Sequence, residues 1–417
     1  MDIKTLFPIM KTVNAIALAA LCLLFLQCNK DNPAPRGIDF KCVDNPGVCD
    51  LTAANGNFAI DLFRQVNSEE PADKNIFISP FSISTALAMT VNGAAGQTRD
   101  DMRHTLRTDG LSLENTNISY KTLLHTLPLL DPATKLKLAN SIWPKKDYPV
   151  LNSFLQTNTA YFNSEILPAD FNDPAVIDEV NGWVETHTDG LIKKTLTELD
   201  PDVVMLLINA IYFKGTWRTE FEAAKTKAAD FFTGAGPVSV QMMHTPESDF
   251  PYLANDLFQA VDLPYGDSVY SMSVFLPNEG HNVSEIIDAL QPDTWTQWLG
   301  AFKTRSVELF LPKFKLEYGK KLKPTLSDMG MGLAFSDGAD FSNMVSSSVK
   351  IDDVIHKAFV EVDEKGTEAA AVTVVVIVET SVPFVPVVNV NRPFLFVIRD
   401  NKTNSILFMG KVVNPGA

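Results

Sequence analysis

The segment HKAFVEVDEKGTEAAAVTVVVIVETSVPFVP, residues 356–386, decides the fold of this chain. Taken locally, residues 372–378 predict a buried β-strand, because the run is uncharged and rich in β-branched side chains. Two features argue against an ordinary core strand. The three alanines at 369–371 would pack the interior of a sheet poorly, and Pro383 and Pro386 end the run. Small residues followed by valines instead suit a segment that enters between two strands already in place.

The overall composition is that of an acidic globular protein. The chain has 417 residues, of which 46% are hydrophobic and 20% charged, so it has ample material for a buried core. This composition excludes a wholly disordered, a collagen-like or a multi-span membrane protein. The formal net charge of -15 repels phosphate backbones, so we expect no nucleic-acid partner.

Residues 55–417 contain no low-complexity break and no repeat, which predicts one large domain. Helical spacing of apolar residues comes early, in the segments 58–66, 82–92 and 177–187. Strand patterns follow in these segments: 136–140, 203–213, 307–311, and two hairpins formed by 261–267 with 270–276 and by 394–398 with 406–409. Helices in the first half and strands in the second predict an α+β fold.

The amino terminus predicts export. An almost unbroken apolar run at residues 15–26 follows two lysines and is too short to span a bilayer comfortably. Cys28 comes next, ahead of a polar stretch, as at the lipidation site of a bacterial lipoprotein. We therefore predict a signal peptide over residues 1–28, lipidation at Cys28, and a membrane-anchored protein in the periplasm or at the cell surface. Plain secretion and a retained membrane anchor are the alternatives, because Gln27 stands where a small residue is usual.

Residues 29–54 are predicted to form a flexible tether. Asparagine, proline and glycine are frequent there and oppose a long regular element. Cys42 and Cys49 lie in this segment, where they either close a small ring in an oxidising compartment or remain two free thiols.

Familiar catalytic motifs are missing from the main body. All four cysteines lie within the first 49 residues, which excludes a cysteine nucleophile or a zinc knuckle beyond them. The sequence has no HExxH, G-x-S-x-G, Walker or GxGxxG motif. Ser347 and Lys350 match the Ser-x-x-Lys pattern of penicillin-binding enzymes, but the accompanying Lys-Thr-Gly and Ser-Asp-Asn are absent. We expect no metal, no cofactor and no turnover enzyme, with an exported hydrolase using Ser347 as a rival.

Blocks along the whole body resemble the serpin family. Residues 356–371, HKAFVEVDEKGTEAAA, are similar to the hinge signature of that family. Further blocks follow in the family's order: NIFISPFSI at 75–83, GAAGQT at 93–98, LANSIW at 138–143, NAIYFKGTW at 209–217, LPKF at 311–314, NRPF at 391–394 and FMGKV at 408–412. The resemblance covers residues 55 to 415.

The resemblance implies a fold and a mechanism. The fold would be the α+β serpin fold, with three β-sheets, about nine helices and an exposed reactive-centre loop. In this family the loop is bait for a serine endopeptidase, which is trapped as an acyl-enzyme while the cut loop inserts into the main sheet. We expect a monomeric suicide inhibitor whose covalent partner is a serine endopeptidase. A non-inhibitory binding module and an inhibitor of cysteine proteases are the alternatives.

The hinge of the loop has the composition that insertion requires. By resemblance the hinge comprises Glu364, Gly366, Thr367, Glu368, Ala369, Ala370, Ala371 and Thr373. Side chains alternate along a strand, so residues 367, 369, 371, 373, 375 and 377 would face inward on insertion. All six are small or apolar, and Glu368 falls on the outward parity.

The scissile bond lies near the end of the valine run. Counting from Gly366 by the family's spacing places the bond at Thr380-Ser381, whereas counting back from Pro393 moves it to Val382. The candidate window is therefore Val378, Glu379, Thr380, Ser381 and Val382. Small and β-branched residues there suit elastase-like pockets better than trypsin-like ones, and Glu379 leaves a glutamate-preferring protease open.

Five residues of the body match positions that act during insertion. Ser79, Ser82, Asn209 and His356 resemble the polar cluster beneath the main sheet where the strands part. Trp217 resembles the tryptophan at the point where the loop enters the sheet. The alternative is that the polar four are satisfied buried hydrogen-bonding groups and that the tryptophan is core packing.

Overall fold

The computed structural model describes residues 40–41, 44–200, 202–367 and 385–416. In this part of the chain there are nine α-helices and three β-sheets, as the α+β prediction requires. The helices are α2 Pro46–Glu69, α3 Pro80–Val91, α4 Gly96–Thr105, α5 Leu113–Thr126, α6 Asn152–Phe162, α7 Ala175–His187, α8 Val283–Ala289, α9 Pro292–Ala301 and α10 Lys323–Leu326.

The strands alternate with these helices at first and then dominate the chain. In order they are β1 Ile76–Ile78, β2 Lys135–Pro144, β3 Glu165–Ile166, β4 Met205–Thr216, β5 Lys227–Thr233, β6 Gly236–Ala254, β7 Phe258–Tyr265, β8 Tyr270–Pro277, β9 Lys303–Pro312, β10 Phe314–Lys321, β11 Ile355–Val362, β12 Gly366–Thr367, β13 Val387–Asn389, β14 Phe394–Asp400 and β15 Ile406–Val412. Both predicted hairpins are confirmed, because β7 pairs with β8 and β14 pairs with β15 in antiparallel register.

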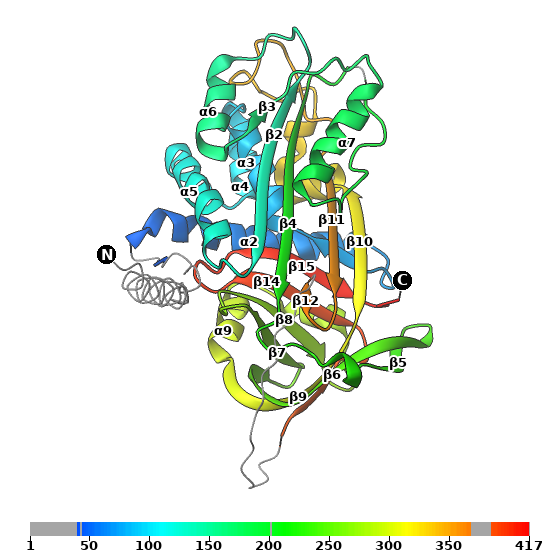
Figure 1. The fold of residues 1–417 in the computed structure, drawn as a ribbon. Coiled ribbons are helices and arrows are strands. Elements are labelled where there is room, and N and C mark those ends of the chain that lie inside the picture. The colour runs from blue at the N-terminus through cyan, green and yellow to red at the C-terminus, as the bar shows by residue number, and fades with distance from the viewer. Residues whose placement is uncertain (1–39, 42–43, 201, 368–384, 417) are drawn as a thin grey trace, which may run out of the picture. The chain divides into compact units, whose positions relative to one another are not determined.

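Two of the sheets lie side by side and leave a gap between them. One has the order β12-β4-β2-β3, and the other consists of β10 and β11 (Figure 1). Strands β4 and β11 face each other across the gap, yet within the described residues they do not pair with one another. Among the described strands, the two-residue β12 lies at this gap, where it pairs with the carboxyl end of β4. We call this gap the slot.

The third sheet lies beyond the slot and receives the far end of the predicted loop. Its order is β1-β15-β14-β8-β7-β6-β9-β13, and β5 pairs with β6. The described chain resumes at residue 385 and enters β13, which runs parallel to β9. The predicted loop is therefore attached at β12 on one side and at β13 on the other.

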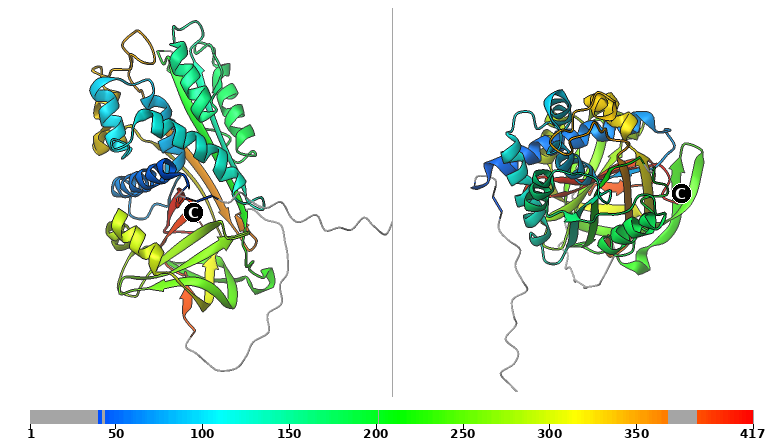
Figure 2. Two further views of the ribbon diagram at one scale, coloured as in Figure 1. Left: turned by 90° about the vertical axis from the view of Figure 1, so that its left-hand side faces the viewer. Right: turned by 90° about the horizontal axis from the view of Figure 1, so that it is seen from above.

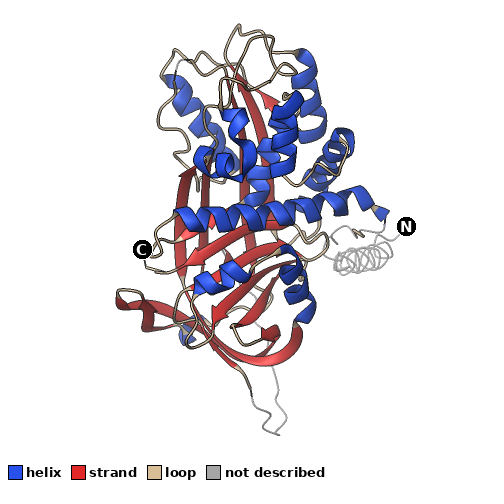
Figure 3. Ribbon diagram, turned by 180° about the vertical axis from the view of Figure 1, so that it is seen from behind, coloured by secondary structure: helices blue, strands red, loops and turns tan. Residues whose placement is uncertain are grey.

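Helices cover both faces of the sheet that contains β4. Figure 2 shows α7 on one face and α3 on the opposite face, and Figure 3, seen from behind, shows α2 crossing in front of the strands. Helix α3 is buried along nearly its whole length, as its apolar sequence predicts. Helix α7 contributes Val180, Trp183 and Val184 to a separate apolar cluster with Trp143 of β2.

The predicted tether is wrong over residues 46–54, because helix α2 begins at Pro46. Proline is favoured in the first turn of a helix, where its missing N–H group would have no partner within the helix. Val48 and Leu51 are buried, so the apolar stripe of α2 extends further back than the pattern from Phe58 onward indicated. Cys49 in this helix is disulfide-bonded.

Several predictions about the ends and the loop lie outside the described residues. These are the signal peptide, the lipidation site Cys28, the first part of the tether with Cys42, and residues 368–384 of the loop. None of the helices in the described ranges is long and apolar enough to cross a membrane.

Candidate functional site

The start of the hinge already lies in the slot. Gly366 and Thr367 form β12 and pair antiparallel with Thr216 and Gly215 of β4. The Thr367 side chain is only 5% exposed, and its Oγ1 lies 2.8 Å from the hydroxyl of Tyr265, which is itself buried. Thr367 therefore faces inward in the intact chain, as its predicted parity requires, before any cleavage of the loop.

Only glycine fits at position 366. Its φ of +150° is rarely adopted by residues with a side chain, and a Cβ atom there would lie 2.0 Å from the carbonyl oxygen of Gly215. The backbone of Gly366 exchanges hydrogen bonds with that of Asp363, at 3.0 and 3.3 Å. The close approach explains why the hinge turns sharply from β11 into the slot at this residue.

Glu364 anchors the turn between β11 and β12. Its carboxylate accepts hydrogen bonds from Lys313 Nζ and Thr226 Oγ1, each at 2.8 Å, and its backbone carbonyl accepts one from the N–H of Phe221. Burial acts to raise the pKa of Glu364, but the hydrogen bonds from Lys313, the local backbone and Thr226 outweigh it and hold the pKa below its usual value. The carboxylate is thus charged while the hinge sits in place.

Trp217 closes the same end of the slot. Its indole stacks on Tyr265 with ring centroids 4.4 Å apart, and its Nε1 donates to the carbonyl of Asp363 at 3.0 Å. Its backbone N–H donates to the carbonyl of Lys365 at 2.8 Å. The structure therefore brings Trp217, Glu364, Gly366 and Thr367 together at one site, where the tryptophan contacts the hinge directly besides packing in the core.

Beyond Thr367 the slot continues as a cavity of about 130 Å³. One wall is β4, through Ile211, Tyr212 and Phe213, and the other is β11, through Phe359, Val360 and Glu361, with Asp363 just after it. Thr188, Leu191 and Ile192, which follow α7, also line it. A chain that continued from Thr367 along the direction of β12 would enter this cavity.

The turn after α7, residues 188–192, is held against the sheet by ion pairs, and we call it the cover. Asp189 accepts hydrogen bonds from the ammonium groups of Lys135 and Lys137, both on β2. Asp189 and Gly190 both have positive φ values, 50° and 83°, which allow the chain to turn there. One carboxylate thus holds the cover to two lysines.

A polar network joins β11 to the start of α3 beneath the far part of the slot. The backbone N–H of Ser79 donates to Nε2 of His356 at 3.1 Å, and Ser79 Oγ donates to the carbonyl of Leu407 at 2.8 Å. His356 is buried, and burial lowers its pKa to about 4. The ring is therefore neutral at pH 7, as an imidazole nitrogen that accepts a hydrogen bond must be.

The network continues from α3 to β4 and β2. The backbone N–H of Ser82 donates to Ser79 Oγ at 3.2 Å, and the Ser82 hydroxyl donates to Asn209 Oδ1. Asn209 Nδ2 then donates to Asn140 Oδ1 at 2.7 Å, across the paired strands. The four predicted polar residues thus form one connected network, and side chains link β11 to β4 where the backbone does not.

Sequence reasoning missed three partners of the predicted residues: Tyr265, Lys313 and Asn140. Each lies in a predicted hairpin or in a block that resembles the serpin family, but its role depends on a contact between segments that are distant in the sequence. Asn140 alone had a usable signal, because asparagine is depleted in strands and stands here in the middle of one. The bond window Val378–Val382 and hinge residues 368–373 lie outside the described residues.

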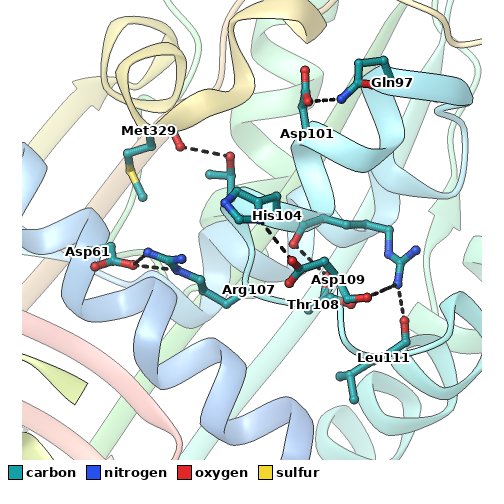
Figure 4. Close-up of polar contacts among 11 residues, drawn as sticks. Asp61, Gln97, Asp101, His104, Arg107, Thr108, Asp109, Leu111 and Met329 are labelled. Atoms are coloured by element: carbon teal, nitrogen blue, oxygen red, sulfur yellow. Dashed lines mark hydrogen bonds and ion pairs between the residues drawn. The ribbon is translucent and has the colours of Figure 1, made fainter. Parts of the chain in front are cut away.

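A larger hollow of about 380 Å³ is lined by residues of α2, α4 and α8, and Figure 4 shows the polar contacts of Asp61, His104 and Arg107 beside it. Its charges are largely paired within the protein: Arg107 donates twice to Asp61, and His104 bonds Asp109. We assign it no function. In the described residues no group of histidine, cysteine and acidic side chains could hold a metal ion.

The Ser-x-x-Lys pattern is not assembled as a catalytic pair. Ser347 Oγ lies 2.6 Å from the hydroxyl of Tyr148, and Lys350 Nζ donates to Asp337 at 2.5 Å. The lysine is thus engaged elsewhere, and nothing in the geometry supports a hydrolase that uses Ser347.

Comparison with known proteins agrees with this geometry. The family model for serpins, serine protease inhibitors, matches residues 53–415. Iripin-2 of Ixodes ricinus is 38% identical over 371 residues, which are 87% of this chain and 93% of that protein. The native-state structure of the thermophilic serpin Tengpin is 35% identical, with a TM-score of 0.80 over 90% of this chain and 96% of that one. Human thyroxine-binding globulin complexed with thyroxine also matches, at 30% identity and a TM-score of 0.80 over 88% and 99% of the two chains. This chain therefore belongs to the serpin family.

Proposed function

We propose that this protein is a suicide inhibitor of a serine endopeptidase, and that the protease it traps is elastase-like. The observation that supports the proposal best is the position of Gly366 and Thr367, which already pair with β4 at the mouth of the slot between β4 and β11, two strands that do not pair with each other. After cleavage, insertion of the loop extends the existing strand β12, so no new strand has to be nucleated in the sheet. The small and β-branched residues of the window favour an elastase-like pocket.

The chemistry of the trap follows from an ordinary acyl transfer. The serine Oγ of the protease attacks the carbonyl carbon of Thr380, the bond to the nitrogen of Ser381 breaks, and that nitrogen leaves with a proton as a new amine. The acyl-enzyme ester is normally hydrolysed by water. Here the freed hinge extends β12 along the slot and carries the ester-bound protease away before hydrolysis. Inhibition therefore depends on the rate of insertion relative to deacylation.

The test is a denaturing gel of the protein mixed with an elastase-type protease. We expect a covalent band of the combined mass, stable to detergent and lost after the ester is cleaved by base. A chain that is only cut, with no such band, would favour a non-inhibitory role. The similarity to thyroxine-binding globulin is the reason to keep a binding module as the second candidate. A covalent band formed only with a papain-type protease would favour the third candidate, an inhibitor of cysteine proteases.

Scanning calorimetry gives a second test that does not need the target protease. Cleavage within residues 378–382 by any protease frees the hinge to enter the slot, where its backbone gains partners on β4 and β11. The melting temperature should rise after cleavage by a trapping serpin. An unchanged melting temperature would contradict the insertion mechanism.

We also propose that the protein is exported and held at a membrane by lipid on Cys28. The support is the apolar run at 15–26 followed by Cys28 and a polar segment. Cys28→Ser should move the protein from the membrane fraction to the soluble fraction. Equal fractionation of the variant and the parent would contradict the anchor.

A further inference from the structure

We propose that the outward face of β13, β9 and β6 is a second contact surface, in addition to the loop, for the target protease while it docks on the uncut loop. This inference rests on the proposed function. The surface, called here the outer patch, comprises Val387, Asn389, Glu308, Phe310 and His244. It would set which proteases associate fast enough to be inhibited.

Register places these five side chains next to one another. Asn389 pairs with Phe310, and Phe310 pairs with His244 on the next strand, so the three form one row across the sheet. Val387 pairs with Glu308 in the neighbouring row. The alternate residues Val388 and Leu309 are fully buried, so the patch is the solvent side of these strands.

The patch presents apolar and aromatic surface in a fixed arrangement. Val387 is 48% exposed. The rings of Phe310 and His244 stack in parallel, with centroids 4.3 Å apart and an interplanar angle of 5°. His244 Nε2 also lies 3.0 Å from Glu308 Oε1, so the histidine ring is held from two sides. A rigid aromatic pair beside an exposed aliphatic side chain is suited to bind a protein surface.

Chain length shows that a bound protease must lie near this patch. The window 378–382 ends five residues before Val387 and starts nine residues before it, so at ~3.5 Å per residue the bond lies within about 18–32 Å of Val387. An endopeptidase of about 230 residues has a radius of gyration near 17 Å and is about 45 Å across. The enzyme is thus wider than the tether that connects it to β13. Thr367, the other attachment of the loop, is at least eleven residues from the window. The chain therefore allows a larger distance between the scissile bond and Thr367 than between the bond and Val387.

A second exposed apolar side chain lies at the same attachment. Phe232 of β5 is 51% exposed, and its backbone N–H donates to the carbonyl of Asn391, two residues beyond β13. Among the described residues five large apolar side chains are exposed, and Val387 and Phe232 are two of them. Ile118 and Leu129, at 46% and 47%, are two others and lie on the helical side of the molecule, in α5 and in the short helix after it. They provide controls with equal exposure.

The experiment measures the second-order rate constant for inhibition of an elastase-type protease. The variants are Val387→Ser and Phe310→Ser for the patch, Phe232→Ser for the neighbouring side chain, and Ile118→Ser and Leu129→Ser as matched controls. We expect a fall of about fivefold or more for each patch variant, the size of a contact residue that matters in an interface. The controls should stay within a factor of two of the parent.

Two further readouts separate a contact surface from a structural role. The number of inhibitor molecules consumed per protease trapped should not change, because insertion begins only after cleavage, and the melting temperatures of the variants should match those of the controls. Equal rate constants for patch and control variants would overturn the proposal, even with covalent complex formed normally. Absence of covalent complex from the parent would instead overturn the proposed function on which it rests.

Discussion

Placing a charge at Thr367 tests the insertion mechanism at its first step. In the intact chain this side chain is 5% exposed and bonds the buried hydroxyl of Tyr265. The slot beyond it is lined by the carboxylates of Glu361 and Asp363, which could serve as partners for an introduced arginine. A carboxylate is therefore the sharper probe, because it finds only like charge there. The change to make is Thr367→Glu.

The magnitude follows from burial. An unpaired carboxylate in a buried site costs several kcal/mol even after relaxation, so residue 367 should leave the slot and β12 should be lost. Insertion after cleavage must place the same residue back in the slot. Each ~1.4 kcal/mol added to that barrier slows insertion about tenfold. A penalty of about 3 kcal/mol would slow insertion by roughly two orders of magnitude, and deacylation would then release the protease.

The assay is the ratio of covalent complex to cleaved inhibitor, measured with one elastase-type protease. Thr367→Gln is the control for size without charge, and Thr367→Val removes only the hydroxyl. The valine can stay in the slot both before and after cleavage, so the lost hydrogen bond to Tyr265 destabilises both states by about 1–3 kcal/mol and the yield of complex should stay near that of the parent. Equal yields of complex for Thr367→Glu and the parent would refute the reasoning.

Three further changes test the rest of the site. Gly366→Ala should expel the hinge from the slot, because the new Cβ would meet the carbonyl oxygen of Gly215 at 2.0 Å, and hydrogen exchange at Gly215 and its neighbours should then speed up. For His356, the folded-state pKa near 4 lies below the ordinary 6.5, so the unfolded state binds the proton first and stability should fall by about 3 kcal/mol as pH drops from 6.5 to 4. Denaturant titration across that range should show this loss in the parent and less of it in His356→Gln. Asp189→Asn should loosen the cover and speed insertion, and high salt should bring the parent toward the variant, because the lysine partners are partly exposed.

Local pattern in the sequence predicted most of the elements. The apolar spacing of α7 and the two hairpins needed only neighbouring residues, and both are present as predicted. The start of α2 differs from the prediction because Pro46 and Gly47 are residue types that commonly interrupt regular structure, whereas proline at the first position of a helix is favourable. The early start of α2 is decided by the burial of Leu51 in the core of the protein, which a local sequence pattern does not predict.

The candidate site shows a different limit. The residue types of the hinge and of the polar network were predicted, but not that Thr367 is already paired with Gly215 in the intact chain. That contact depends on the distance in space between β4 and β11, two strands that are about 150 residues apart in the sequence. The partner Tyr265 comes from a third segment, the hairpin of β7 and β8. A sequence pattern predicts which hinge side chains face inward. Tertiary packing decides how many hinge residues already lie in the slot of the intact chain.

Different contacts hold the structure together at the two ends of the slot, and the lack of backbone pairing between these ends explains how insertion can be favourable. At one end β12 supplies backbone partners for β4, and at the other end the network from His356 through Ser79, Ser82 and Asn209 ties the two strands by side chains. Between the ends there is cavity instead of a ladder. An entering strand therefore breaks no backbone pairs between β4 and β11, and the backbone hydrogen bonds that it makes there are all gained. If β4 and β11 were paired with each other, each new bond would replace an old one and the loop would have little reason to enter.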